Sequence, residues 1–165
     1  MRAPAAFLLS LSVFGAALVY IRREKARCEA LCSLRTFFER LSACCAVEKS
    51  DTLCKIKNAS AELPGFYEAL MQAYDLSGSL VSAWREAVLT GPLSALLQQP
   101  ALSYLADFSD GFESVSQARF IERCREAEDY FASAGEGMRR RFSQLRQTAL
   151  SFGILGAILV FIIVV

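Results

Sequence analysis

The sequence predicts an all-α protein, with a helical bundle bracketed by transmembrane helices at its N- and C-terminal ends. First, hydrophobic residues make up 54% of the 165 residues, more than the ~45–50% that is usual for globular domains. Second, charged residues are missing from two long apolar runs, one near each end. Third, the residues between these runs are rich in Ala, Leu, Glu, Arg and Gln, which favour helices, and show no sustained strand-like alternation.

The two apolar runs, residues 3–21 and 149–165, are the predicted transmembrane helices. They contain 19 and 17 residues, and a helix rising ~1.5 Å per residue needs about 17–25 residues to cross a hydrocarbon core of ~30 Å. Both runs contain Gly and Ser, which membrane helices tolerate. A cleaved signal peptide is the alternative for the first run, and a buried core helix is the alternative for the second.

Basic residues lie beside both runs, on the side toward the middle of the chain. Because Lys and Arg are enriched on the cytoplasmic side of membrane helices, residues 22–148 are predicted to be a cytoplasmic bundle, with both termini outside. Only Arg2 opposes this orientation. The same side chains are expected to meet anionic lipid headgroups. These membrane-flanking basic residues are Arg22, Arg23, Lys25, Arg27, Arg139, Arg140, Arg141 and Arg146.

Two long helices are expected within the bundle, each continuing an apolar run. Residues 22–47 contain no Pro or Gly, so the first membrane helix is expected to continue through them. The last helix is expected to begin where Ser114 and Gln117 match a capping box. Gly135 and Gly137 are its weak point, since each costs ~1 kcal/mol relative to Ala in a helix.

Apolar seams on the two long helices predict that these helices are antiparallel and touch. Both seams use spacings of three and four residues, which place apolar side chains on one helix face. The seam residues are Leu31, Leu34, Phe38, Leu41 and Cys45 in the first helix, and Phe120, Cys124, Ala127, Phe131, Ala134, Met138 and Leu145 in the second.

Shorter helices are expected between the long ones, with starts and ends indicated by capping residues, Pro and Gly. The only tryptophan, Trp84, lies among apolar residues of one short helix and is expected in the core. The expected elements are a helix from Asp51 or Thr52 to about Ala61, a helix from Pro64 to the break at Ser77-Gly78, a helix that ends before Gly91-Pro92, one or two turns in 93–98, a helix from Pro100 to Phe108, and a turn at Asp110-Gly111.

An acidic central region is concealed by the net charge of +1. Residues 58–118 hold seven acidic residues and a single basic one, Arg85. Acidic surfaces attract basic partners, so these acids are candidates for a partner-binding face. The alternative is a solvated surface, since acids are also favoured at helix N-termini. The candidate partner-binding residues are Glu62, Glu68, Asp75, Glu86, Asp107, Asp110 and Glu113.

Residue content argues against several function classes. Histidine is absent, which removes Ser-His-Asp triads, Cys-His dyads and His-ligated metals. No phosphate-binding glycine-rich loop, GxSxG motif or HExxH motif occurs. A net charge near zero gives no reason to expect nucleic-acid binding. We therefore predict that the protein is not an enzyme and has no catalytic, cofactor-binding or metal-binding residues and no cofactor.

Six cysteines lie between the two apolar runs. In a cytoplasmic domain they are expected to be reduced and to act as small apolar residues. No paired CxxC motif is present, which disfavours a metal site. A membrane-anchored thiol or metal protein that uses Cys28, Cys32, Cys44 and Cys45 is the alternative function.

The whole plan resembles the stage III sporulation protein AB family, whose members are small proteins with an apolar helix at each end and a helical cytoplasmic domain between. The carrying features are the basic segment RREKARCEALCSLRTFFERL, the pair Ala83-Trp84, the segment YLADFSDGFESVSQ that leads to Gln117, the alanine-spaced segment AEDYFASAGEGMRRRFSQL and the tail SFGILGAILVFIIVV. The chain departs from the family at Thr52-Leu53, where a proline is usual, and near Asp110-Gly111, where a Leu-Gly pair usually precedes the glutamine.

The resemblance implies a scaffold in the channel-like complex that sporulating cells assemble between mother cell and forespore. The family's soluble domain is similar to the cytoplasmic F domain of the platform proteins of type II secretion and type IV pili. This similarity implies a place in the mother-cell membrane, which is the outer forespore membrane. It also implies contacts with a cytoplasmic secretion-type ATPase and with other membrane components. A homo-oligomer is a further possibility, and the family has no catalytic residues to carry over.

Overall fold

The computed structural model describes residues 3–47, 51–112 and 116–164. Their regular structure is entirely helical, with no strand among them, which confirms the predicted all-α class. The chain divides into two compact units, one of residues 29–135 and the other of residues 1–28 and 136–165. Among the described residues, no helix is both long enough and apolar enough to cross a membrane.

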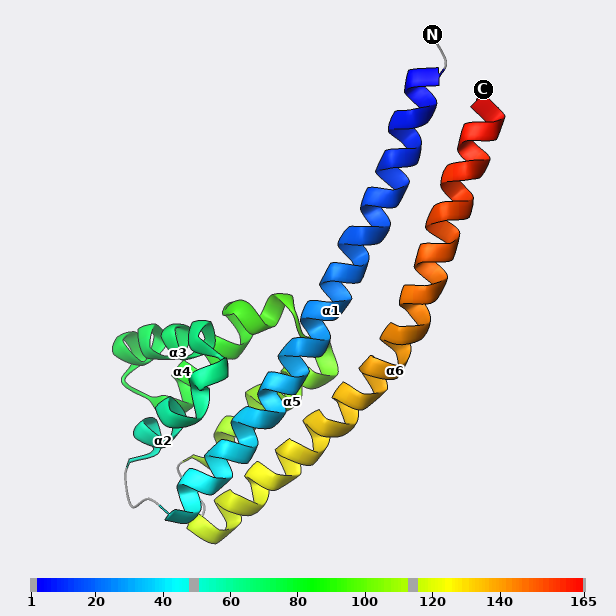
Figure 1. Ribbon diagram of the computed structural model, residues 1–165. Coiled ribbons are helices and arrows are strands. Elements are labelled where there is room, and N and C mark those ends of the chain that lie inside the picture. Colours follow the sequence, from blue (N-terminus) through cyan, green and yellow to red (C-terminus); the bar gives the residue numbers. More distant parts are fainter. Residues whose placement is uncertain (1–2, 48–50, 113–115, 165) are drawn as a thin grey trace. The chain divides into compact units, whose positions relative to one another are not determined.

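Two long helices each have residues in both units (Figure 1). They are α1 (Ala3–Val47), which has 45 residues, and α6 (Gln117–Val164), which has 48 residues. The expected continuation of each apolar run into a long helix is therefore confirmed. No break occurs at Gly135 or Gly137.

Within residues 29–135, α1 and α6 are antiparallel and in contact, as their apolar seams predict. Near one end of the pair, the Gln117 side chain donates a hydrogen bond to the carbonyl oxygen of Cys45, at 2.5 Å. Farther along, the rings of Phe38 and Phe131 stack with centroids 5.5 Å apart. Gln117 thus satisfies a carbonyl at the C-terminal end of α1, where intrahelical partners are missing. Its expected capping partner, Ser114, lies outside the described residues.

The first short helices begin and end at the signals that the sequence carries. Helix α2 (Thr52–Ala59) is capped by Asp51, whose carboxylate accepts a hydrogen bond from the Thr52 backbone N–H at 2.8 Å. After the 3₁₀ turn η1 (Ser60–Glu62), α3 (Pro64–Ser77) starts with proline in its first turn. It ends at Gly78, whose φ of 65° lies in the left-handed region that glycine adopts without steric cost.

The second half of the bundle core is built from short helices that follow directly on one another. Ser79 caps α4. The helix ends before Gly91-Pro92, as predicted. The turn expected at Asp110-Gly111 is instead part of a 3₁₀ helix. Helices α3 and α4, joined by only two residues, pack against each other as a hairpin (Figure 1). The elements are α4 (Leu80–Thr90), η2 (Pro92–Ala95), α5 (Gln99–Asp107) and η3 (Phe108–Gly111).

Trp84 lies at the centre of the core of residues 29–135, as predicted, and has no exposed surface. Its indole N–H donates a hydrogen bond to the carbonyl oxygen of Leu105 on α5, at 2.7 Å. Rings from α1, α3 and the η3 region pack around it, with centroids 5.0–6.1 Å away. This cluster fixes the inner face of the α3–α4 hairpin and leaves its outer face to solvent. The surrounding rings are Phe37, Phe66, Phe108 and Phe112.

The unit of residues 1–28 and 136–165 combines a buried ion pair with exposed apolar side chains. Glu24 is only 6% exposed and is paired with Arg27, one turn later on α1, at 2.5 Å. Removing Arg27 would leave the buried carboxylate of Glu24 without its ion-pair partner, which is destabilising. Large apolar side chains near the helix ends are 40–70% exposed, namely Leu18, Val19, Tyr20, Ile154, Leu155, Ile158 and Ile162.

Candidate functional site

Two of the seven predicted partner-binding acids are already engaged by arginines of the same chain. Glu62 pairs with Arg40 at 2.7 Å, and Asp110 pairs with Arg85 at 2.5 Å. Both pairs are exposed, so each contributes little to stability. A carboxylate held in this way is nevertheless less available to a basic partner. Glu113 lies outside the described residues.

Glu68, Asp75 and Glu86 form a second group, which we call the acidic hairpin. All three are exposed and form no ion pair within 4.0 Å among the described residues. Glu68 and Asp75 are seven residues apart on α3, and therefore lie two turns apart on one face. Glu86 lies on α4. Since the single base of residues 58–118, Arg85, is held by Asp110, no cation of the hairpin neutralises these acids.

A surface groove of about 580 Å³ borders the acidic hairpin, between α3, the end of α4 and η2. Leu76 of α3 lines it and is 85% exposed, and Glu86 of α4 also lines it. Small side chains such as Ala69 and Ala73 leave the groove open. The groove therefore places an exposed apolar side chain and an unpaired carboxylate around one hollow.

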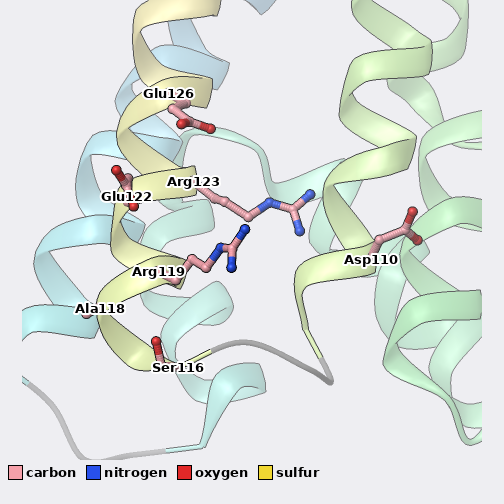
Figure 2. A pocket seen from close by; sticks show the side chains of 7 residues that line it. All are labelled: Asp110, Ser116, Ala118, Arg119, Glu122, Arg123 and Glu126. Atoms are coloured by element: carbon pink, nitrogen blue, oxygen red, sulfur yellow. The ribbon is translucent and has the colours of Figure 1, made fainter.

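A second, open pocket of about 1020 Å³ lies at the start of α6. Figure 2 shows the side chains of Arg119 and Arg123 reaching from α6 toward the segment that carries Asp110. Glu122 and Glu126 also line this pocket, so positive and negative charges are mixed along one helix face. Such a mixture is typical of a solvated helix surface and gives the pocket no strong preference for one sign of charge.

Arg123 connects α6 to η3 and so has a structural function. Its guanidinium lies 5.6 Å from the centroid of the Phe108 ring, within the range of a cation–π contact, and donates a hydrogen bond to the carbonyl oxygen of Asp107 at 3.4 Å. Gly111 makes room for it, because a Cβ at that position would collide with the guanidinium. The carboxylate of Asp107, another predicted partner-binding residue, is exposed and forms no ion pair among the described residues.

The predicted membrane-flanking basic residues differ in their surroundings. Arg27 is ion-paired with Glu24 on the same helix. The side chain of Arg146 lies outside the described residues. The exposed members of the set are Arg22, Arg23, Lys25, Arg139, Arg140 and Arg141.

The cysteines on which the alternative function depends lie on α1, while the other two lie on α2 and α6. Cys124 is buried, and this burial, together with neighbouring Cys45, raises the pKa of the Cys124 thiol to about 12. A thiol with such a pKa is protonated at neutral pH and reacts poorly as a nucleophile. Cys54, on α2, is exposed. Among the described residues, no three Cys, Asp or Glu side chains are grouped closely enough to hold a metal ion.

Sequence reasoning missed Leu76 and Arg119, and both omissions have a physical cause. The core positions of α3 are Phe66, Leu70 and Ala73, and at ~100° per residue Leu76 falls about 60° beyond Ala73, at the edge of this stripe. A helical wheel therefore marks it as an apolar residue at the edge of the buried face. Arg119 is one turn before Arg123, but only the fold shows that both line one pocket.

Comparisons with known proteins add no relationship: no family model matches the chain, no curated protein matches it, and no solved structure matches it. The resemblance to the sporulation family therefore stays a prediction from the sequence.

Proposed function

We propose that the protein is a non-enzymatic membrane scaffold of a secretion-like complex, of the kind assembled between mother cell and forespore during sporulation. In this proposal, residues 3–21 and 149–165 anchor the chain in the mother-cell membrane, which is the outer forespore membrane. Residues 22–148 face the cytoplasm, where they dock a cytoplasmic secretion-type ATPase and contact other membrane components. The kind of complex follows from the sequence resemblance alone.

The observation that carries the anchoring is the exposure of large apolar side chains in two segments, residues 18–20 of α1 and residues 154–162 of α6. Outside these two segments, the described residues expose only three large apolar side chains, at Val47, Leu76 and Leu89. On α6, Ile154, Ile158 and Ile162 follow one another at four-residue intervals and therefore lie on one face. Contiguous apolar surface of this kind is typical of contact with lipid or with another protein. The uncharged sequence around it favours lipid.

The acidic hairpin supports the docking part of the proposal. Four of the predicted partner-binding acids, Glu68, Asp75, Glu86 and Asp107, form no ion pair among the described residues. The first three lie on the outer face of a hairpin whose inner face is fixed by the core. Unpaired charges on a rigid surface attract a partner of opposite charge and orient it during the encounter. The bundle would thereby hold a basic partner at the membrane.

The experiment is co-purification with crosslinking from sporulating cells that express the tagged full-length chain. We expect the secretion-type ATPase and membrane components of the complex to be recovered with the wild type. The triple variant Glu68→Lys, Asp75→Lys and Glu86→Lys is expected to lose the ATPase. Recovery of the ATPase with this variant at the wild-type level would rule out the acidic hairpin as its docking surface.

A matched control separates docking from a general effect of charge. Glu39, Glu122 and Asp129 are also exposed, in the same unit but outside the hairpin. Their replacement by lysine changes the net charge by the same amount and is expected to leave recovery unchanged. If neither the ATPase nor any membrane component is recovered with the wild type, the proposed complex is wrong.

A further inference from the structure

We propose that the groove between α3, the end of α4 and η2 binds an amphipathic helical segment of a partner protein, with an apolar side chain of that segment against Leu76 and a Lys or Arg against Glu86. This inference deepens the docking part of the proposed function and rests on it for the statement that the occupant belongs to a partner protein. It adds the chemistry and the shape of the segment that is recognised.

The shape of the groove suits a helix. The α3 side is formed by Ala69, Gln72, Ala73 and Leu76, which are spaced three and four residues apart and form a row two turns long. Alanine side chains in this row leave hollows, and the side chains of a second helix can enter hollows of this kind. A volume of about 580 Å³ is large enough for several side chains.

Leu76 is a large apolar side chain that is left uncovered on one wall of the groove. Leu76 is 85% exposed, although Leu70 and Ala73 on the same helix are buried. Covering a leucine of this kind removes apolar surface from water and favours association. Residues that carry much of the binding energy lie in pockets near the centre of an interface that become fully desolvated, and Leu76 would be placed in this way by a segment bound in the groove.

Charge complementarity identifies the occupant as basic. Glu86 lines the groove, while Glu68 and Asp75 lie on the α3 that forms one of its sides, and none of the three has an ion-pair partner among the described residues. An anionic lipid headgroup would be repelled by these carboxylates. A cationic side chain beside an apolar anchor satisfies both features, as in helix-in-groove recognition.

The test uses the full-length chain in phosphatidylcholine nanodiscs and a fluorescein-labelled peptide as the probe. The peptide is a 16-residue helix former of Ala, Gln and Lys with leucines at i, i+4 and i+7, and its binding is followed by fluorescence anisotropy. A second peptide carries serine in place of the leucines at the same charge, and empty nanodiscs give the background. We expect the leucine peptide to bind at least about tenfold more tightly than the serine peptide.

Variants at exposed positions test the groove without disturbing the core. Leu76→Ser is expected to weaken binding of the leucine peptide about tenfold, and Glu86→Gln to weaken it roughly threefold and to reduce its salt dependence. The matched controls are Leu89→Ser, at a leucine of α4 that is 54% exposed and outside the groove, and Glu39→Gln, at an exposed glutamate of α1 that does not line the groove. Both controls are expected to bind like the wild type.

Three outcomes overturn the proposal. They are equal binding of the two peptides, binding that neither Leu76→Ser nor Glu86→Gln changes, and self-association of the chain that Leu76→Ser abolishes while the peptide fails to bind. The last outcome would assign the groove to a second copy. Because the assay needs neither an ATPase nor sporulating cells, its failure is distinct from failure of the proposed complex.

Discussion

Trp84 contributes to stability in two ways, through apolar burial and through one long-range hydrogen bond. The burial is expected from the sequence, since Leu80, Val81 and Val88 surround Trp84 at helical spacing. The hydrogen bond to the Leu105 carbonyl could not be predicted from the sequence, because the two residues are 21 positions apart and meet only in the folded chain. The carbonyl of Leu105 lies in the last turn of α5, where intrahelical partners run out.

Replacement of Trp84 by phenylalanine therefore removes more than ring area. We expect Trp84→Phe to lower the free energy of unfolding by about 1–3 kcal/mol beyond the effect of the smaller ring, since the Leu105 carbonyl is left buried without its donor. Urea unfolding followed by far-UV circular dichroism measures this, as no tryptophan remains for fluorescence. Phe37→Leu, which shrinks a neighbouring ring without affecting a hydrogen bond, is the comparison, and equal losses in the two variants would contradict the expectation.

Cys124 makes stability depend on pH in the alkaline range. Burial, with Cys45 adding, raises the pKa of its thiol from 9.0 to about 12. Between these values the unfolded chain releases the proton while the folded chain keeps it, so the folded state is destabilised as the pH rises, by up to ~1.4 kcal/mol per pH unit. This contribution is fully favourable below about pH 9 and is lost progressively as the pH approaches 12.

Urea unfolding under reducing conditions at several pH values from 8 to 10.5 tests this. At pH 8 we expect Cys124→Ala to be less stable than the wild type, because it leaves a small cavity. The difference should shrink as the pH rises, since alanine does not titrate. Cys54→Ala, at an exposed thiol, should keep the wild-type slope. Parallel pH profiles for the wild type and Cys124→Ala would show that the buried thiol does not titrate as described.

At the scale of elements, helix boundaries follow from local chemistry and were therefore predictable. Asp51 accepts the backbone hydrogen bond expected of an N-cap, and Pro64 and Gly78 begin and end α3 as their backbone preferences require. The structure has a 3₁₀ helix where a turn was predicted at Asp110-Gly111, because a Gly-containing pair fits both kinds of structure. The packing of Arg123 against Gly111 cannot be predicted from the local sequence.

Helix α6 continues through Gly135 and Gly137, and no close contact of the described residues requires glycine at either position. A Cβ at Gly135 would lie 3.9 Å from Leu31 Cβ and 4.0 Å from Cys32 Sγ, which is ordinary contact, and a Cβ at Gly137 would meet nothing within 4 Å. Alanine is therefore tolerated sterically at both positions. The two glycines lie where the bundle unit, residues 29–135, ends.

We expect Gly135→Ala and Gly137→Ala to raise the free energy of unfolding by about 0.5–1 kcal/mol each, because alanine loses less backbone entropy on entering a helix. Ala134→Gly should lower it by a similar amount and serves as the inverse control. Thermal and urea unfolding both report the change. A loss of stability in the alanine variants would mean that the glycines provide a close approach that the described side chains do not account for.

At the scale of the whole molecule, composition together with the lack of strand-like alternation predicted the all-α class, because a chain rich in helix formers and without that alternation favours helices over strands. The surfaces were less predictable. The seven central acids form a single group in the sequence. The fold pairs Glu62 and Asp110 with arginines, and the other four that the structure describes, Glu68, Asp75, Glu86 and Asp107, form no ion pair among the described residues. Arg40, which pairs with Glu62, lies 22 positions away, so no local pattern could separate the two groups.

The proposed membrane anchoring concerns the whole chain, and the exposed apolar side chains make it testable. Ile154 and Ile158, on one face of α6, are 54% and 51% exposed. Aspartate near the centre of a membrane helix costs about 2.5–3.5 kcal/mol on insertion scales, and two such residues should exceed what a run of 17 residues gains. We therefore expect Ile154→Asp combined with Ile158→Asp to move the protein from the carbonate-resistant membrane fraction to the extractable fraction.

The control for this prediction places charge at apolar residues that are equally or more exposed but lie in the bundle. Leu76→Asp combined with Leu89→Asp adds the same charge at side chains that are 85% and 54% exposed. If the ends of α1 and α6 contact lipid, this control stays in the carbonate-resistant fraction while the Ile154 and Ile158 variant leaves it. If both variants stay in the carbonate-resistant fraction, the exposed isoleucines of α6 do not contact lipid. If the wild type itself is extracted by carbonate, residues 3–21 and 149–165 do not anchor the chain. Their exposed apolar side chains would then contact another protein instead.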